Sequence, residues 1–265
     1  ERRLTRPEHG YSLGKGGVAV GGTSREFLYK FYIPKLTNLY IGNTILRYTI
    51  QEKIFMQIIC LGDSITDCNH LFEDFPLGNG YVQMLSEMFQ KHTINISDTM
   101  QFKNYGIDGF TVARVLENIR LQRIPLHRSP IITLLIGVND IGLMMNTDRT
   151  EFQKKQMMQD FVAHYKELLK LLTRDARQVI LMEPFIFPHP EEYQTWIPYV
   201  RTMSTHIRQL SEKFNLPFLP LHDYFNNEAI QKGFDQITTD GIHLTRYGHE
   251  LLATLLYEVI IKEFH

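Results

Sequence analysis

A succession of short, almost uninterrupted apolar runs starts at Met56 and constrains the fold more than any other feature of the sequence. In chain order the runs read MQIICL, MQFKNYG, IITLLIG, QVILM and LPFLPL. Strands that are buried on both faces of a parallel sheet are nearly continuous in hydrophobicity, whereas half-exposed antiparallel strands alternate. The runs therefore predict a parallel sheet that is covered on both sides.

Segments with helical periodicity separate these runs. YVQMLSEMFQ and TVARVLENIR each place apolar residues on one face, and longer helices are predicted over 151–174, 191–214 and RYGHELLATLLYEVIIKEF. Alternating strands and helices are typical of an α/β fold with helices on both faces of the sheet. We therefore predict a single three-layer α/β domain over residues 56–265.

The first 55 residues differ from this pattern, and we predict an N-terminal extension over residues 1–55 whose order the sequence leaves open. The stretch GYSLGKGGVAVGGT contains a formal G-x-G-x-x-A match, but no strand precedes it and no matching helix follows it. It therefore fails the context that a dinucleotide-binding loop requires. Residues 26–50 are aromatic and β-branched, and they predict one or two strands.

Composition excludes several classes of partner. The formal net charge is -1, so there is no electrostatic reason to expect nucleic acid or an anionic membrane as a partner. No apolar run approaches the roughly 20 residues that span a bilayer. The two cysteines, Cys60 and Cys68, are too few for a metal cage or a disulfide framework. With no readable secretory signal, the chain is expected to be cytoplasmic.

Polar residues that could carry chemistry follow several of the predicted strands. Taken singly, each has an ordinary structural explanation, because glycines permit turns and Asn or Asp caps helices. Ligands of open α/β sheets bind at the carboxyl ends of the strands, where these residues would converge. Together they supply a hydroxyl, an imidazole, a carboxylate and donors for an oxyanion, as a serine hydrolase requires. They are Gly62, Asp63, Ser64, Asn104, Gly106, Gly109, Gly137, Asn139, Asp140, Asp240 and His243.

Four motifs, GDSIT, NYGIDGFT, GVND and DGIHLT, occur in that order and resemble the four sequence blocks of the SGNH (GDSL-type) hydrolases. The resemblance covers essentially all of residues 56–265. PLGNGYVQML, GVNDI and LMEPF are also similar to a group of small bacterial esterases that includes acetylxylan esterases. The resemblance implies a flavodoxin-like fold with a five-stranded parallel sheet in the order 2-1-3-4-5.

Site residues follow from the resemblance, position by position. Ser64 matches the nucleophile, and Asp240 and His243 match the Asp-x-x-His block that completes a catalytic triad. The oxyanion hole would consist of the backbone N–H groups of Ser64 and Gly109 and the side-chain amide of Asn139. Neither a metal nor an organic cofactor is implied. The other histidines have no matching partners, so structural or surface roles are expected for them.

The sequence departs from the family at two places. Leu244 follows His243, where the family often has proline, and Ile141-Gly142 stands near the position where acetylxylan esterases carry a tryptophan. An aromatic wall around a sugar ring could instead come from Phe72, Phe75, Phe185, Phe187 and Trp196, with Asp74 or Glu191 to bind hydroxyls. The alternative is that these aromatic residues belong to the core.

The expected activity is hydrolysis of short-chain acyl esters, acetyl esters in particular, of a small molecule or an oligosaccharide. A thioesterase or a lysophospholipase of the same family is the enzymatic alternative. A non-catalytic carbohydrate-binding protein on this fold is the alternative from another class, although Ser64, Asn139 and His243 are all present. A nucleotide binder would need a phosphate loop or an acidic cluster after the first strand, and Asp63 alone does not provide one. Association into a homo-oligomer stays open.

Overall fold

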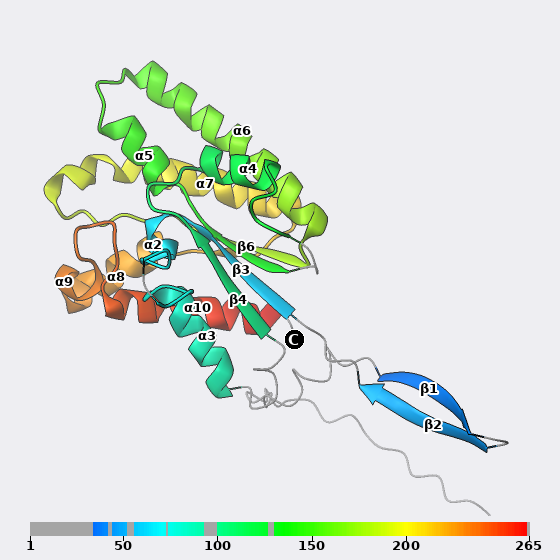
Figure 1. The fold of residues 1–265 in the computed structure, drawn as a ribbon. Helices are drawn as coiled ribbons and strands as arrows, with labels where there is room; N and C mark the ends of the chain where they lie inside the picture. Colours follow the sequence, from blue (N-terminus) through cyan, green and yellow to red (C-terminus); the bar gives the residue numbers. More distant parts are fainter. Residues whose placement is uncertain are drawn as a thin grey trace, which may run out of the picture.

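The computed structural model describes residues 34–41, 44–51, 56–72, 74–92, 100–126 and 130–263. Its centre is a five-stranded sheet in the order β4-β3-β5-β6-β7, in which every neighbouring pair is parallel (Figure 1). The strands are β3 (Met56–Gly62), β4 (Met100–Gly106), β5 (Ile131–Leu135), β6 (Gln178–Met182) and β7 (Phe218–Leu219). Counted along the domain, this order is 2-1-3-4-5, so the predicted fold class and strand order are confirmed.

Helices cover both faces of the sheet (Figure 1). One face carries α3 (Tyr81–His92), α8 (His222–Lys232), α9 (Phe234–Ile237) and α10 (Arg246–Glu263). The other carries α4 (Val112–Arg120), α5 (Val138–Met145), α6 (Glu151–Asp175) and α7 (Ile197–Phe214). The predicted three layers are therefore present.

The position of β3, between two helical layers, explains why its sequence is continuously apolar. All of its residues are buried, and successive side chains point to opposite faces of the sheet. Ile58 and Cys60 pack in the core beneath α3 and α10, whereas Ile59 and Leu61 pack in the core beneath α4, α6 and α7. A polar residue at any of these positions would lie in one of the two cores.

The helix predicted over 191–214 is interrupted. It begins as a 3-10 helix, η1 (Glu191–Thr195), and α7 starts only at Ile197. Pro198 lies in the first turn of α7, where its missing N–H group and fixed φ are tolerated. The proline therefore marks the start of the α-helix, later than periodicity alone predicts.

Within the predicted N-terminal extension, the structure describes two strands, β1 (Pro34–Ile41) and β2 (Thr44–Gln51). They pair antiparallel as a separate two-stranded sheet, with Pro34 opposite Gln51 and Ile41 opposite Thr44. The prediction of strands in this region is confirmed. The glycine-rich stretch before them lies outside the described residues, and the division at residue 55 stays a prediction.

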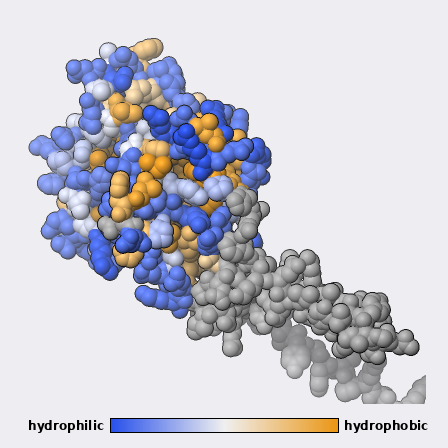
Figure 2. All heavy atoms as spheres, in the orientation of Figure 1, coloured by the Kyte–Doolittle hydropathy of each residue, from blue (hydrophilic) through white to orange (hydrophobic). Residues whose placement is uncertain are grey.

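Most apolar side chains of the described domain are enclosed in the two cores. On the face shown in Figure 2, polar residues predominate and apolar residues occur in small groups among them. Within the part of the chain that the structure describes, no helix is long and apolar enough to cross a membrane.

One buried hydroxyl offers a test of the packing. The Tyr165 hydroxyl is buried and has no hydrogen-bond partner among the described residues, whereas the Tyr81 hydroxyl lies 3.1 Å from Thr66 Oγ1. Because an unpaired buried hydroxyl costs free energy, Tyr165→Phe should leave the free energy of unfolding unchanged or raise it by up to about 1 kcal/mol. Tyr81→Phe should lower it by about 1 kcal/mol. Urea denaturation compares the two, and an equal loss in both would contradict the assignment.

Candidate active site

The nucleophile candidate Ser64 is presented by a tight turn at the carboxyl end of β3. It opens the one-turn helix α2 (Ser64–Asp67), and Asp63 caps this helix by accepting the Ile65 N–H at 3.1 Å. A Cβ atom on Gly62 would lie 2.1 Å from Thr66 Oγ1 and 2.6 Å from the Leu135 carbonyl oxygen. Glycine is therefore required where the chain folds back from strand to helix.

The structure brings Ser64, His243 and Asp240 together in one hydrogen-bonded chain. His243 Nε2 lies 2.9 Å from Ser64 Oγ, and His243 Nδ1 lies 2.6 Å from Asp240 Oδ2. A carboxylate can only accept, so Nδ1 carries the proton and Nε2 is free to accept one from the serine. This is the arrangement in which an imidazole can act as a general base.

The loop that carries Asp240 and His243 is held by its own polar groups. Asp240 Oδ1 accepts the backbone N–H groups of Ile242 and His243 at 2.9 and 2.7 Å. Burial acts to raise the pKa of Asp240, but the His243 ring and these two N–H groups outweigh it, and the pKa is lower than usual. The carboxylate is therefore ionised and points at the imidazole.

The same loop is tied to the segment after β6. Gly241 has φ of +92° and its carbonyl oxygen accepts the Phe187 N–H at 2.9 Å. A Cβ atom there would lie 2.1 Å from the His189 carbonyl oxygen, so both the conformation and the space demand glycine.

The three expected oxyanion donors also lie at strand ends. Among the described residues, neither the Ser64 nor the Gly109 backbone N–H has a hydrogen-bond acceptor. Gly109 has φ of +71°, and the Phe110 N–H donates to the Ile107 carbonyl oxygen at 3.1 Å. These two features define a type II turn over residues 107–110, with Gly109 at the position that requires positive φ.

Asn139 joins this turn from α5. Its side-chain Nδ2 donates to the Phe110 carbonyl oxygen at 3.0 Å, so the amide of the third motif is fixed against the second motif. Nothing lies within 4 Å of a Cβ built on Gly109, so the space beside this residue's α-carbon is open. A carbonyl oxygen of a substrate could occupy such a space.

Two buried polar residues have roles that the sequence motifs did not indicate. Asp140 Oδ2 accepts the Val112 N–H at 3.1 Å and so caps α4, whose own N-cap residue Thr111 makes no side-chain bond. Asn104 donates its amide to the carbonyl oxygens of Thr66 at 2.7 Å and Leu77 at 2.9 Å. The sequence predicted that both residues lie near strand ends, but it did not predict which backbone groups they bind.

Two further histidines have structural roles, as expected from their lack of matching partners. The Tyr81 N–H donates to His249 Nδ1 at 3.3 Å, and His249 Nε2 lies 3.4 Å from Cys68 Sγ. Burial, with the charge of His243, lowers the pKa of His249 to about 4, so the ring is neutral. His222 is buried as well, and its Nδ1 accepts the Ile186 N–H at 3.4 Å.

The expected aromatic wall is not formed. Phe185 and Phe187 are 1% and 0% exposed and pack with Phe225 in the core, and Trp196 is also buried. Phe72 and Phe75 are instead exposed in the segment between α2 and α3. The wall prediction is therefore wrong for the three buried residues, because the segment after β6 turns them into the sheet-covering layers.

Trp196 lies against α5, beside Gly142. A Cβ atom on Gly142 would lie 3.7 Å from two carbons of the Trp196 indole. The indole comes from the start of α7 and reaches Gly142, whose missing side chain leaves room for it. It supports the helix that bears Asn139 and is not a platform open to a ligand.

A cleft adjoins the triad on the side of Asp240. Its lining includes His189, Phe234, Asp235 and Thr239. Polar side chains and the apolar Pro190 and Phe234 line it together, and its exposed surface is more apolar than polar. Among the described residues, no group of three or more His, Cys, Asp and Glu side chains is placed to hold a metal ion.

Asp140 leads to a prediction about pH. Burial raises its pKa from 3.8 to about 7, against the lowering effect of the Val112 N–H. The folded protein then retains a proton that the unfolded chain releases near pH 4, so stability falls as pH rises from about 4 to about 7. Asp140→Asn should make this fall smaller by about 1 kcal/mol or more, since each pKa unit corresponds to about 1.4 kcal/mol.

Urea unfolding at about pH 5 and about pH 7.5 measures the effect. Some loss of stability between these two pH values should remain in the variant, because burial also raises the pKa of Asp63 to about 7. Asp148→Asn, at an exposed position, is the control and should retain the fall seen in the parent protein. A variant at Asp140 that also retains it would refute the assignment.

Comparisons with known proteins agree with this geometry. A structure of a putative GDSL-like lipase from Parabacteroides merdae is 24% identical, with a TM-score of 0.66 over 80% of this chain and 98% of that chain. An acetylxylan esterase from Geobacillus stearothermophilus is 24% identical, with a TM-score of 0.61 over 79% and 96%. Two further structures of that enzyme, in which a serine and an aspartate are replaced by alanine, are described as catalytic mutants.

An α/β hydrolase from the metagenome of Lake Arreo, Spain, is 18% identical, with a TM-score of 0.62 over 81% of this chain and 98% of that chain. At these identities the likeness shows a shared fold. Comparison with curated protein sequences gives no match. The sequence model of the GDSL-like Lipase/Acylhydrolase family, however, matches residues 60–251. The chain therefore belongs to the GDSL-like lipase and acylhydrolase family and is a carboxylic-ester hydrolase.

Proposed function

We propose that the protein is a serine esterase that hydrolyses short-chain acyl esters, acetyl esters above all, through a triad of Ser64, His243 and Asp240. One observation carries the proposal: the unbroken chain of hydrogen bonds from Asp240 through His243 to Ser64, with lengths of 2.6 and 2.9 Å. A non-catalytic role on this fold does not require such a chain.

In the acylation step, Ser64 Oγ attacks the ester carbonyl carbon and gives its proton to His243 Nε2. Asp240 keeps the ring in the tautomer with Nδ1 protonated and stabilises the imidazolium that forms. The negative charge on the former carbonyl oxygen is held by the N–H groups of Ser64 and Gly109 and by the Asn139 amide. His243 then returns the proton to the leaving alcohol, and an acyl-serine remains.

In the deacylation step, water attacks the acyl-serine while His243 takes a proton from it. The same donors stabilise the second oxyanion, and the proton passes to Ser64 Oγ as the carboxylic acid leaves. Every proton transfer is served by the one imidazole, so the mechanism requires no cofactor.

The cleft beside Asp240 offers both polar and apolar contacts to the leaving alcohol. His189, Asp235 and Thr239 offer polar contacts, and the ring of Phe234 offers an apolar face. A pyranose presents both hydroxyl groups and an apolar C–H face, so an acetylated carbohydrate matches this lining.

A long-chain substrate, as for a lysophospholipase, is the second candidate. Leu71, Phe72 and Phe75 are 61%, 87% and 55% exposed in the segment that follows the nucleophile helix. Exposed apolar side chains of this kind could contact an acyl tail, and chain-length preference separates the two candidates.

Replacing the nucleophile tests the catalytic assignment. Ser64→Ala should abolish ester hydrolysis, whereas the thermal midpoint should stay within a few degrees of the parent value, because the hydroxyl is partly exposed and its loss leaves no cavity. A fluorophosphonate probe should label Ser64 in the parent protein and nothing in the variant, as detected by peptide mass spectrometry. Labelling of another serine, or substantial residual turnover, would mean that the nucleophile lies elsewhere.

A substrate panel tests the acyl group and its acceptor. We expect kcat/KM for p-nitrophenyl acetate to exceed that for the octanoate by roughly tenfold or more, since methylenes of the acyl chain that stay in water gain no free energy from burial. Acetylated xylo-oligosaccharides and acyl thioesters are assayed beside them. Preference for octanoyl or longer esters would favour the second candidate, and fast thioester cleavage with no action on acetylated sugars would exclude the carbohydrate substrate.

A further inference from the structure

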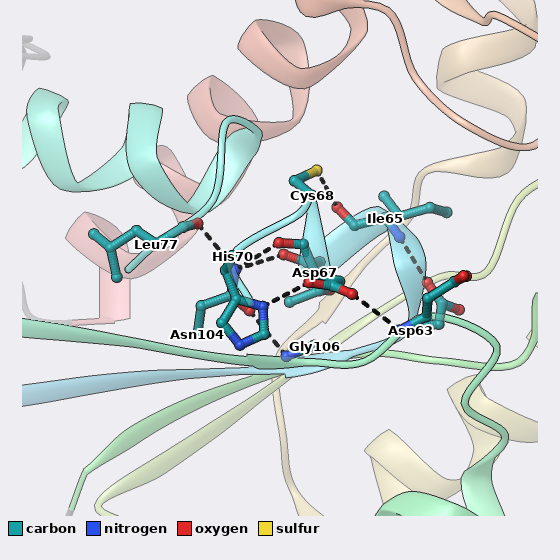
Figure 3. A network of polar contacts seen from close by, with 10 residues as sticks. Asp63, Ile65, Asp67, Cys68, His70, Leu77, Asn104 and Gly106 are labelled. Atoms are coloured by element: carbon teal, nitrogen blue, oxygen red, sulfur yellow. Dashed lines mark hydrogen bonds and ion pairs between the residues drawn. The ribbon is translucent and has the colours of Figure 1, made fainter. Parts of the chain in front are cut away.

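A second Asp-x-x-His pair lies beside the nucleophile and is not part of the triad. Asp67 is the last residue of α2, three positions after Ser64, and its Oδ1 lies 2.6 Å from His70 Nδ1 (Figure 3). Asp240 and His243 have the same sequence spacing and the same 2.6 Å distance. The sequence therefore contains this pattern twice, once just after Ser64 and once just before the last helix.

The two pairs differ in burial and in what they face. Side-chain exposure is 50% for Asp240 and 45% for His243, but only 7% for Asp67 and 10% for His70. His243 directs its second ring nitrogen at Ser64 Oγ, whereas that of His70 has no partner among the described residues. A buried carboxylate must be paired and hydrogen-bonded to be stable, and His70 supplies one of the partners of Asp67.

The other partner of Asp67 lies in the oxyanion turn. Asp67 Oδ2 accepts the backbone N–H of Asp108 at 3.1 Å. Asp108 directly precedes Gly109, and the two form the central positions of the type II turn over residues 107–110. The carboxylate therefore bridges the helix that carries the Ser64 N–H and the turn that carries the Gly109 N–H.

Apart from this bond, the described contacts of that turn lie at its two ends, and Asn139 Nδ2 holds the last residue through the Phe110 carbonyl oxygen, 3.0 Å away. Asp108 and Gly109 are exposed, and a Cβ built on Gly109 would meet nothing within 4 Å. The backbone bond from the Ile107 N–H to the Gly62 carbonyl oxygen, 3.2 Å long, anchors the first residue of the turn. Neither end contact reaches Asp108 or Gly109, so among the described residues the bond from Asp67 to the Asp108 amide is the one that holds the centre of the turn.

The surrounding network makes Asp67 a rigid support. Asn104 Nδ2 donates to the Asp67 carbonyl oxygen at 3.2 Å, and Asn104 Oδ1 accepts the Gly106 N–H at 2.9 Å (Figure 3). A Cβ atom on Gly106 would lie 2.3 Å from the Asp67 backbone nitrogen, so strand β4 and helix α2 are in direct contact. Asp67 therefore cannot move without moving the end of β4.

We propose that Asp67, clamped by His70, is a positioning residue of the oxyanion hole that fixes the Gly109 N–H relative to the Ser64 N–H. The inference rests on the proposed function, because it assigns both N–H groups to the oxyanion of an acyl-transfer reaction. Asp67 itself touches no reacting atom.

Steady-state kinetics on p-nitrophenyl acetate test the proposal with two substitutions. Asp67→Ala should lower kcat by roughly 10- to 100-fold, the scale of a small misplacement of catalytic groups, with KM changed less than about twofold. Asp67→Asn should recover most of kcat, since an amide oxygen of the same size can still accept the Asp108 N–H. His70→Ala should lower kcat by a smaller factor, because the carboxylate stays but loses its clamp.

A second readout separates oxyanion binding from general structural damage. A methyl trifluoromethyl ketone adds to the active serine, and its oxyanion occupies the same site as that of the ester. Its inhibition constant should rise in Asp67→Ala by about the factor by which kcat falls. Glu183→Ala is the matched control, because the Glu183 carboxylate is also buried and accepts the N–H groups of Leu221 and His222 at 2.7 and 2.8 Å. It should lower the thermal midpoint without changing kcat or the inhibition constant.

Three outcomes would overturn the proposal. Asp67→Ala could keep kcat and ketone affinity, it could raise KM alone, or Asp67→Asn could be as impaired as Asp67→Ala, which would make charge the cause. If Asp67→Ala does not fold, His70→Ala decides: a lower kcat at unchanged KM supports the proposal, and an unchanged kcat overturns it. Failure of the proposed function is distinct, since the parent protein would then show no ester turnover that Ser64→Ala removes.

Discussion

The site depends on the register of three parallel strands at their carboxyl ends. Gly62 of β3 pairs with Gly106 of β4 on one side and with Leu135 of β5 on the other. Because all three strands end at the same edge, the turn that carries Ser64 lies between the turn over residues 107–110 and the helix that carries Asn139, with neighbouring strands about 4.8 Å apart. The two glycines at this edge leave the space in which α2 folds back onto the sheet.

Buried polar residues then convert this placement into fixed geometry. Asp63 caps α2, Asp140 caps α4 and Asn104 ties α2 to β4. In each case a buried side chain accepts or donates a bond that the backbone would otherwise leave unmade, and an unpaired buried group is costly. The same bonds that stabilise the fold therefore orient the segments that carry Ser64, Gly109 and Asn139.

The substrate is constrained from two sides. The family assignment gives an ester hydrolase, and the cleft beside Asp240 combines polar side chains with a larger apolar surface, which matches the carbohydrate that we propose as the leaving group. The aromatic side chains after β6 take no part in this, because Phe185 and Phe187 fill the core. The exposed side chains of Leu71, Phe72 and Phe75, between α2 and α3, would instead suit a longer acyl chain.

The sequence by itself determined the α/β class and the places where chemistry could occur, and the resemblance of its motifs to a known family implied the order of the strands. Apolar runs, helical periodicity and turn residues act over a few neighbouring positions, so they can be read without the fold, and the motifs around Ser64, Asn139 and His243 stand at strand ends or in the loop before the last helix. Tertiary structure alone decided the partners: Asp140 reaches Val112 across 28 positions, Asp67 reaches Asp108 across 41, and His243 reaches Ser64 across 179. Likewise, whether Phe187 lined a site or filled the core depended on how its segment crosses the sheet. Local patterns carry no information on such contacts, because they form only when distant segments pack together.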